Sequence, residues 1–253
     1  MKWKTAFSTA VGKKIIMGAT GLFLITFLIV HCYINAQVFY NDGGENFNTL
    51  AHFMGTNPII RIVEIGLMVF LFWHAILGLR LWFRNMARRK SRYAVSAGNK
   101  TSSWYSRSMG ILGTLILLFL VVHLTAFWAP NRTSQIAHGE ELDLFQRMAD
   151  AFSNPIVVAI YIFGCISLAW HLVHGFYSAF QTFGLTQHRY KHGIYNMGVG
   201  FSIIVPLLFA AMPLWFYGGT HGWFDMKPTV FHHQVDSQLR GPLSSPDNST
   251  GVE

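Results

Sequence analysis

The chain has 253 residues, of which 52% are hydrophobic and only 12% are Asp, Glu, Lys or Arg, and its net charge is +8. Soluble domains carry about 25% charged residues, so this composition argues against a soluble single domain and against a disordered chain. Long uncharged stretches make a membrane a better explanation of the positive charge than nucleic acid. Cys32 and Cys165 both lie in apolar runs, which excludes a disulfide framework and a cysteine-ligated metal site.

Five apolar segments come close to or exceed the roughly 20 residues that a helix needs to cross a bilayer. They cover residues 15–36, 58–82, 109–129, 155–180 and 197–217. The sequence therefore predicts an all-α membrane protein with five transmembrane helices, in a membrane domain of residues 1–217. Residues 218–253 are expected to form a tail outside the membrane, disordered from about residue 236, where Ser, Pro, Gly and charged residues predominate.

The distribution of charge predicts the orientation, because Lys and Arg are enriched in cytoplasmic loops. The segment before the first span and the loop between the second and third spans carry most of them. On this topology all 11 Asp and Glu fall on the outer half, whereas most of the 19 Lys and Arg fall on the cytoplasmic half. We therefore expect a multi-pass chain with its N-terminus in the cytoplasm and its C-terminus outside.

The first four predicted spans contain a two-span repeat. Residues 17–31 align without gaps to residues 109–123, with seven of fifteen positions identical. The next span of each half contains the motif Trp-His-x-x-x-Gly, at residues 73–78 and 170–175. Both copies enter the membrane in the same direction, so a pseudo-twofold axis along the membrane normal would relate them.

This symmetry predicts two facing pairs of histidines inside the membrane, His31 with His123 and His74 with His171. At a helical rise of about 1.5 Å per residue, the first pair lies about 25 Å from the cytoplasmic edge and the second about 15 Å. Ionisable residues inside a membrane are functional candidates. Zinc, copper or a proton relay could use such pairs, but two histidines on opposite helices suit haem iron best. No Cys-x-x-Cys-His motif is present, so each haem would be b-type.

Glycines near the histidines support the haem interpretation. Gly78 and Gly175 follow His74 and His171 by four residues, on the same helix face, where a missing side chain would make room for a flat macrocycle. A contact between helices through small residues is the alternative. Four further glycines lie far from the histidine of their own helix and are interpreted as helix-packing residues: Gly18, Gly21, Gly110 and Gly113.

His174 competes with His171 as a ligand, since it lies only three residues further along the same span. The repeat equates His174 with Leu77, which has no ligand chemistry. We therefore prefer His171.

The four histidines, their order along the spans and the basic loop after the second span resemble a known family. It comprises the five-helix, two-haem cytochrome b subunits of succinate dehydrogenases and fumarate reductases, and the resemblance covers about residues 8–217. It implies that His74 and His171 bind a proximal haem b near the cytoplasm, and that His31 and His123 bind a distal one. It also implies that menaquinone reacts near the distal haem, at the outer side of a bacterial cytoplasmic membrane.

The resemblance further implies protein partners. The chain has neither a Gly-x-Gly-x-x-Gly motif nor a cysteine cluster, so it would be a non-catalytic electron-transfer and quinone-site subunit of a succinate:quinone oxidoreductase. The family places a flavoprotein and an iron–sulfur subunit on the cytoplasmic side, where residues 84–107 are the candidate docking segment. A dimer of the whole complex is compatible with this arrangement, and no nucleic-acid partner is expected.

Two other functions stay open at this point. One is the cytochrome b subunit of a hydrogenase or formate dehydrogenase, although one ligand per span in a two-span repeat argues against it. The other is a proton-coupled transporter that uses histidines as a relay. Paired discontinuous spans, which are typical of many transporters, are lacking.

Glu64 is the one acidic residue within a predicted span. It lies ten residues from His74, which corresponds to about 15 Å toward the outside, at the level of the distal pair. Glu64 is therefore a candidate proton acceptor in the oxidation of menaquinol. An ion pair with Arg61, one helical turn back, is an equally good interpretation.

Overall fold

The computed structural model describes residues 9–87 and 108–229, and all regular structure in these ranges is helical. Five long helices are α2 (Ala10–Asn35), α4 (Pro58–Ala87), α6 (Met109–His123), α9 (Pro155–Thr182) and α10 (Lys191–Thr220). The shorter elements are η1 (Ala36–Tyr40), α3 (Glu45–Thr56), the π-helical segment η3 (Leu124–Trp128), α7 (Ala129–His138) and α8 (Leu144–Phe152). Most of the candidate docking segment and the tail expected to be disordered lie outside the described residues.

Five continuous helical stretches are long and apolar enough to cross a membrane, which confirms the predicted all-α fold with five spanning helices. They run over Val11–Tyr40, Pro58–Ala87, Met109–His138, Pro155–Thr182 and Lys191–Thr220. Each stretch extends beyond the predicted apolar segment at one end or at both, because polar residues continue the helical hydrogen bonding past the last apolar residue. The third extends furthest, through η3 and α7.

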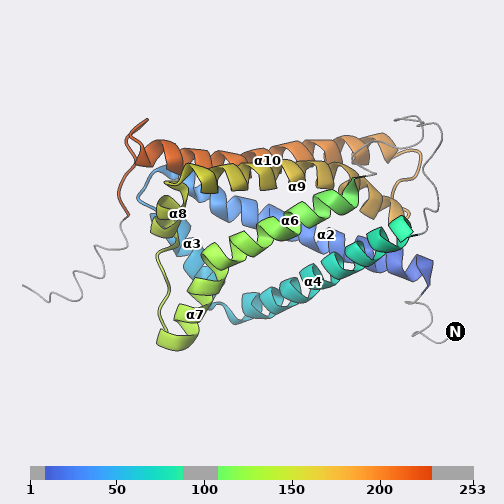
Figure 1. Cartoon of the computed structure of the whole chain (residues 1–253), viewed down its shortest axis with the longest axis horizontal. Coiled ribbons are helices and arrows are strands. Elements are labelled where there is room, and N and C mark those ends of the chain that lie inside the picture. Colours follow the sequence, from blue (N-terminus) through green and yellow to red (C-terminus); the bar gives the residue numbers. More distant parts are fainter. Residues whose placement is uncertain (1–8, 88–107, 230–253) are drawn as a thin grey trace, which may run out of the picture.

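The long helices form a bundle in which α9 has the central place. It packs against α10, α6 and α2, whereas α4 packs mainly against α2 and α6 among the long helices. In Figure 1 the helices run side by side along the longest axis, with α10 and α9 at one edge and α4 at the other. The short helices α3, α7 and α8 gather at one end of the bundle, which we call the α8 end.

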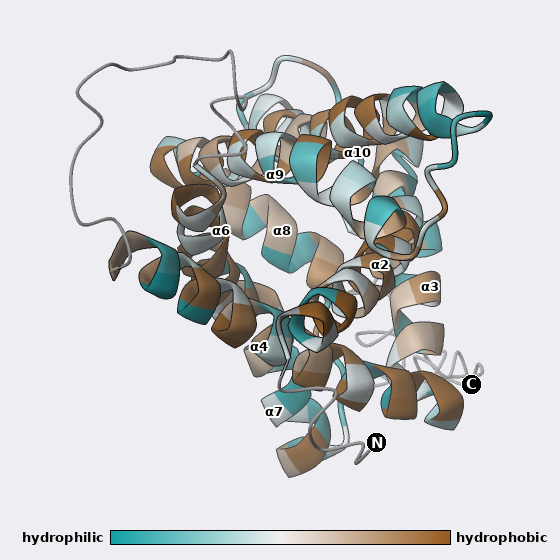
Figure 2. Cartoon of the chain, turned by 90° about the vertical axis from the view of Figure 1, so that its right-hand side faces the viewer, coloured by the Kyte–Doolittle hydropathy of each residue, from teal (hydrophilic) through white to brown (hydrophobic). Residues whose placement is uncertain are grey.

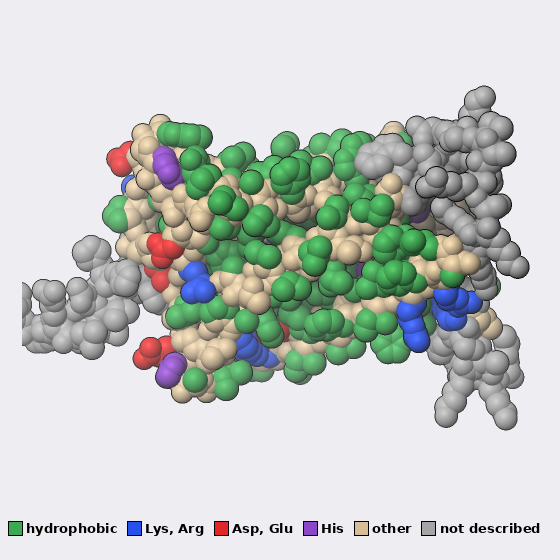
Figure 3. Space-filling view, in the orientation of Figure 1, with side chains coloured by type: hydrophobic (Ala, Val, Ile, Leu, Met, Phe, Trp, Pro, Cys, Tyr) green, Lys and Arg blue, Asp and Glu red, His purple; other side chains and the backbone are tan. Residues whose placement is uncertain are grey.

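The outward faces of the bundle are apolar along its length. Ile62 on α4, Phe163 on α9 and Leu207 on α10 are 72%, 71% and 66% exposed. Figure 2 shows hydrophobic residues on the long helices, and Figure 3 shows them covering the middle of the molecule. Exposed apolar surface on this scale is typical of contact with lipid.

The most tightly packed apolar core lies at the α8 end. The amphipathic helix α8 buries Phe145 and Phe152 against Phe216 of α10, whose side chain has no exposed surface. Asp143 caps α8 by accepting a hydrogen bond from the backbone nitrogen of Gln146 at 3.0 Å. In Figure 3 most acidic side chains in view gather at this end, as expected for the polar edge of a membrane bundle.

Gly164 allows α9 to approach α6 closely. A Cβ at this position would lie 2.6 Å from the ring of Phe119, and that ring stacks on His123 with a centroid separation of 5.8 Å. The space beside Gly164 therefore fixes both a helix contact and the surroundings of a predicted site residue.

We expect Gly164→Ala to destabilise the protein by about 1–3 kcal/mol, because the new methyl group overpacks the Phe119 contact. Gly200→Ala is the matched control, since a Cβ there meets no atom within 4 Å and alanine favours the helix by up to about 1 kcal/mol. Thermal unfolding in detergent measures both effects. Equal stability of the two variants would contradict the close contact.

Candidate functional site

The structure brings the four predicted histidines together in two pairs. His31 on α2 faces His123 on α6 with ring centroids 5.8 Å apart, and the two ring planes are perpendicular. His74 on α4 faces His171 on α9 at 6.3 Å, with an interplanar angle of 68°. Each of the four helices thus contributes one imidazole, and His171 rather than His174 stands opposite His74.

The separation of the rings fits a metal held between them. A bond from a metal to an imidazole nitrogen measures about 2 Å, so two imidazoles on opposite sides of one metal have ring centroids about 6 Å apart. Both observed separations lie close to this value. In residues 9–87 and 108–229 no three His, Cys, Asp or Glu side chains converge as a metal site. Each pair therefore offers two ligands, which suits haem iron better than the four-coordinate sites typical of zinc.

Unpaired polar atoms mark the same two places. In the described part of the chain, the buried side-chain atoms without a hydrogen-bond partner are Nδ1 of His123, Nδ1 of His171 and the hydroxyl group of Tyr161. The Tyr161 ring lies 6.0 Å from that of His123. A buried polar atom without a partner costs about 1–3 kcal/mol. These costs are concentrated at the two histidine pairs, as expected where a bound group completes the site.

Two glycines that we assigned to helix packing lie against the histidines of a neighbouring helix. A Cβ on Gly21 of α2 would lie 3.6 Å from Cε1 of His74, and one on Gly113 of α6 would lie 3.7 Å from Cε1 of His171. These glycines occupy equivalent positions in the two aligned segments. They bring the α2 and α6 backbones close to the imidazoles. Gly18 instead faces the side chains of Phe183 and Thr182, and Gly110 faces that of Trp82.

The glycines after the Trp-His motif have free space beside them. No atom lies within 4 Å of a Cβ placed on Gly175, and the methyl group of Met17 is 3.8 Å from one placed on Gly78. Helix α4 has no buried residue, although it carries His74. A flat group between α4 and α9 would therefore meet little steric obstruction on these faces.

Glu64 is held by donors on both carboxylate oxygens. Arg61 donates from Nη1 to Oε2 at 2.7 Å, and Trp128 donates from its indole nitrogen to Oε1 at 2.7 Å. Arg132 lies 3.6 Å from Oε2. The ion pair with Arg61 that we considered as one interpretation is therefore present within α4. The hydrogen bond from Trp128 joins α4 to η3, the segment that follows His123.

The contacts of Glu64 continue to the surface at the α8 end. Gln135 accepts from Arg61 at 2.7 Å and donates to Glu141 at 2.6 Å. The other oxygen of Glu141 lies 2.6 Å from Nδ1 of His52, whose side chain is 66% exposed. This network joins α3, α4 and α7 and lines an open cavity of about 330 Å³.

The helix that carries His123 widens into the π-helical segment η3 directly after this residue. Pro130 has no N–H to donate to the carbonyl of Ala126, four residues back, and its ring crowds that carbonyl. The guanidinium Nε of Arg147 on α8 donates to the Ala126 oxygen instead. The backbone after His123 is thus held by a side chain of α8, Arg147.

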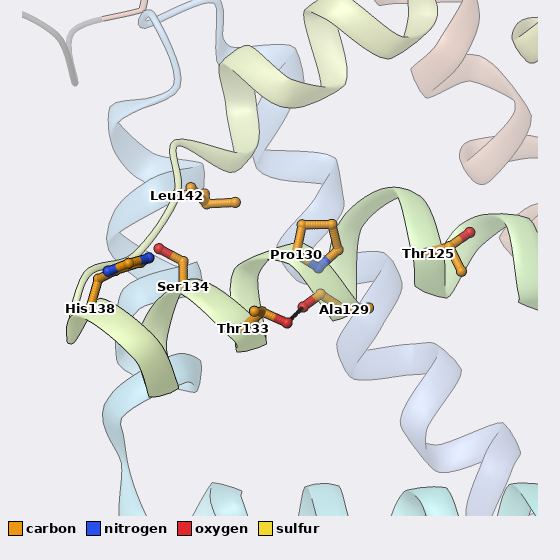
Figure 4. Close-up of a pocket in the computed structure, with 7 residues that line it drawn as sticks. All are labelled: Thr125, Ala129, Pro130, Thr133, Ser134, His138 and Leu142. Carbon is orange, nitrogen blue, oxygen red and sulfur yellow. Dashed lines mark hydrogen bonds between the residues drawn. The ribbon is translucent and has the colours of Figure 1, made fainter.

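A second concavity, an open groove of about 620 Å³, runs beside η3 and α7. Figure 4 shows its lining side chains: Thr125, Ala129, Pro130, Thr133, Ser134, His138 and Leu142. The hydroxyl groups of Thr125 and Thr133 donate to carbonyls of their own helix. Its remaining polar side chains are Ser134 and His138.

Sequence reasoning missed Tyr161 as part of the site. The sequence spacing could have identified it, because Tyr161 lies ten residues before His171 on the same helix. At about 1.5 Å per residue this places it about 15 Å away, at the level of the His31–His123 pair. The helical rise per residue placed Glu64 at the level of the distal pair, and the same calculation places the Tyr161 phenol there.

Known proteins with similar sequences give independent information about the chain. Residues 9–99, which include His31, His74 and Gly78, match the family described as succinate dehydrogenase/fumarate reductase transmembrane subunit. A relative from Bacillus subtilis (strain 168), the succinate dehydrogenase cytochrome b558 subunit, is 29% identical over 161 residues, which are 63% of this chain and 73% of that protein. Among solved structures there is no significant match. The five membrane-length helices support a multi-pass membrane protein. Both comparisons confirm the resemblance that the histidine pattern indicated, because the chain is similar to membrane subunits of succinate dehydrogenases and fumarate reductases.

Proposed function

We propose that the chain is the di-haem b anchor of a succinate:quinone oxidoreductase and carries electrons between menaquinone and the iron–sulfur and flavoprotein subunits. The observation that carries this proposal is the presence of two facing imidazole pairs, at 5.8 and 6.3 Å, on four membrane helices. The pair His31–His123 would hold the distal haem and the pair His74–His171 the proximal one. Haem bound by two histidines supplies one-electron transfer and keeps no open position for oxygen.

The residues around each pair hold the ligands and shape their surroundings. Gly21 and Gly113 let two helix backbones approach the proximal imidazoles, and Gly78 and Gly175 would provide clearance for the macrocycle. Phe119 stacks on His123 at the distal pair. These apolar surroundings keep water away from the ligands.

The charge distribution supports a cytoplasmic position for the soluble partners. Lys13 and Lys14 lie near the start of α2, and Arg80 and Arg84 lie near the end of α4, at the end of the bundle opposite α8. With this end in the cytoplasm of a bacterial cell, the chain follows the positive-inside rule. The iron–sulfur and flavoprotein subunits would dock there and perform the dicarboxylate chemistry.

The outer side supports a quinone site near the distal pair. The groove beside η3 begins at Thr125, two residues after His123, and combines apolar surface with Ser134 and His138. A quinone needs such a combination, with apolar contacts for its ring and tail and a few polar groups for its oxygens. For Glu64 we favour a structural role over that of proton acceptor, because Arg61 and Trp128 occupy both carboxylate oxygens.

Replacing one ligand should remove one haem. We expect the purified wild-type chain to hold two haems, and each of H31A, H74A, H123A and H171A to hold one, because each substitution removes one of the two imidazoles that would hold a haem. H174A is the matched control and should keep both. Haem quantification with reduced-minus-oxidised spectra gives the measurement. A haem-free wild-type chain, or loss of haem in H174A but not in H171A, would refute the ligand assignment.

The intact complex should connect succinate with menaquinone. Purification in mild detergent is expected to yield the chain with a flavoprotein and an iron–sulfur subunit. The complex should catalyse succinate-dependent menaquinone reduction and menaquinol-dependent fumarate reduction. Co-purification of a hydrogenase or a formate dehydrogenase would refute the proposal, and so would a colourless chain that transports protons in proteoliposomes.

Glu64→Gln separates the two interpretations of this residue. The glutamine amide would place N–H groups opposite Arg61 or Trp128, so we expect a loss of stability of about 1–3 kcal/mol. The pH profile of menaquinol oxidation per bound haem should stay unchanged. The exposed Glu140 provides the control variant, Glu140→Gln. A shifted pH profile at normal thermal stability would instead identify Glu64 as a proton acceptor.

A further inference from the structure

Thr20 on α2 makes a hydrogen bond to a predicted haem ligand on another helix. Its Oγ1 lies 3.1 Å from Nδ1 of His74 on α4. The same oxygen lies 2.8 Å from the carbonyl of Ile16 and 3.1 Å from that of Met17, one turn back on α2. Thr20 is only 5% exposed, so water competes little for these contacts.

The direction of this hydrogen bond follows from the number of hydrogens. A threonine hydroxyl group has one hydrogen to donate and can accept through its lone pairs, whereas a carbonyl can only accept. We assign this hydrogen to the contact with the Ile16 carbonyl, which at 2.8 Å is the shortest of the three. Oγ1 then accepts from Nδ1–H of His74, which leaves the lone pair of this imidazole on Nε2, the atom free to bind a metal.

The other half of the chain lacks this contact. In the aligned segments Thr20 corresponds to Leu112 of α6, a buried residue without a polar group. His171 corresponds to His74 in the repeat, and its Nδ1 is buried without a hydrogen-bond partner. The two histidines of the proximal pair therefore differ at Nδ1, although the glycines beside them, Gly21 and Gly113, match.

We propose that Thr20 is a positioning residue that holds His74 as the Nδ1–H tautomer with Nε2 toward the haem iron, and that it makes the two axial ligands of the proximal haem unequal. This inference rests on the function proposed above. A ligand imidazole that donates from its outer N–H becomes a stronger electron donor to the metal and favours oxidised iron. The hydroxyl group of Thr20 should therefore lower the reduction potential of one haem only.

The test uses the complete complex with Thr20→Val, which removes the hydroxyl group at nearly constant volume, and with Thr20→Ser, which keeps it. Thr114→Val is the matched control, because Thr114 on α6 donates only to the carbonyl of Gly110 at 2.8 Å. Haem content and an optical redox titration are measured for each. We expect Thr20→Val to raise the midpoint potential of one haem, and Thr20→Ser and Thr114→Val to leave both potentials near those of the wild type.

The other possible results of this test either support the positioning role of Thr20 or overturn it. Loss of one haem in Thr20→Val with retention in Thr20→Ser would also support the positioning role. Unchanged potentials at full haem content, equal shifts of both haems, or the same change in the valine and serine variants would overturn it. A wild-type complex without haem would refute the proposed function itself, which separates the two failures.

Discussion

Two imidazoles that face each other across about 6 Å, twice within one bundle, are the constraint on which the rest of the structure depends. Polar atoms inside a membrane find no water, so helices must be placed where side chains or a bound group satisfy them. Each facing pair joins a helix of one half to a helix of the other, α2 with α6 and α4 with α9. The close approach at Gly21 and Gly113, and the open space at Gly175, are compatible with keeping these rings opposite each other.

The tight apolar core of the bundle reaches the distal histidine pair through Tyr161, whereas neither histidine of the proximal pair belongs to it. This core is at the α8 end, where Phe145 and Phe152 pack on Phe216, whereas α4 buries no residue completely. This separation is physically reasonable, because dense packing between the facing imidazoles would exclude a flat cofactor. Arg147 connects the two regions, since it extends from the packed helix α8 to the carbonyl of Ala126 just beyond His123. The α8 end is thus closely packed, whereas Gly175 and α4 leave space beside the proximal pair.

The sequence was sufficient to predict the five spanning helices, because the length of an apolar segment is a local property. The repeat also selected histidines that lie opposite one another in the structure. Contacts between helices were harder to foresee. Gly21 looked like a packing residue because only its own helix was considered, yet it lies against His74. The π-helical widening at Leu124–Trp128 depends on Pro130 together with Arg147, a residue on another helix. Such features require the three-dimensional arrangement, which periodicity and spacing do not contain.

The repeat in the sequence does not make the chemistry of the two halves alike. The first half has Thr20 beside His74, and the corresponding residue of the second half is Leu112. The first half also has Asn35, whose amide nitrogen lies 3.3 Å from Nδ1 of His31. The corresponding residue of the second half is Phe127. Both substitutions leave a second-half histidine with an unpaired Nδ1. Ligand hydrogen bonding is one of the few means by which a protein can tune a haem whose axial ligands are identical. Polar neighbours in one half alone would therefore make the two histidines of each pair chemically different, although the repeat places them at corresponding positions.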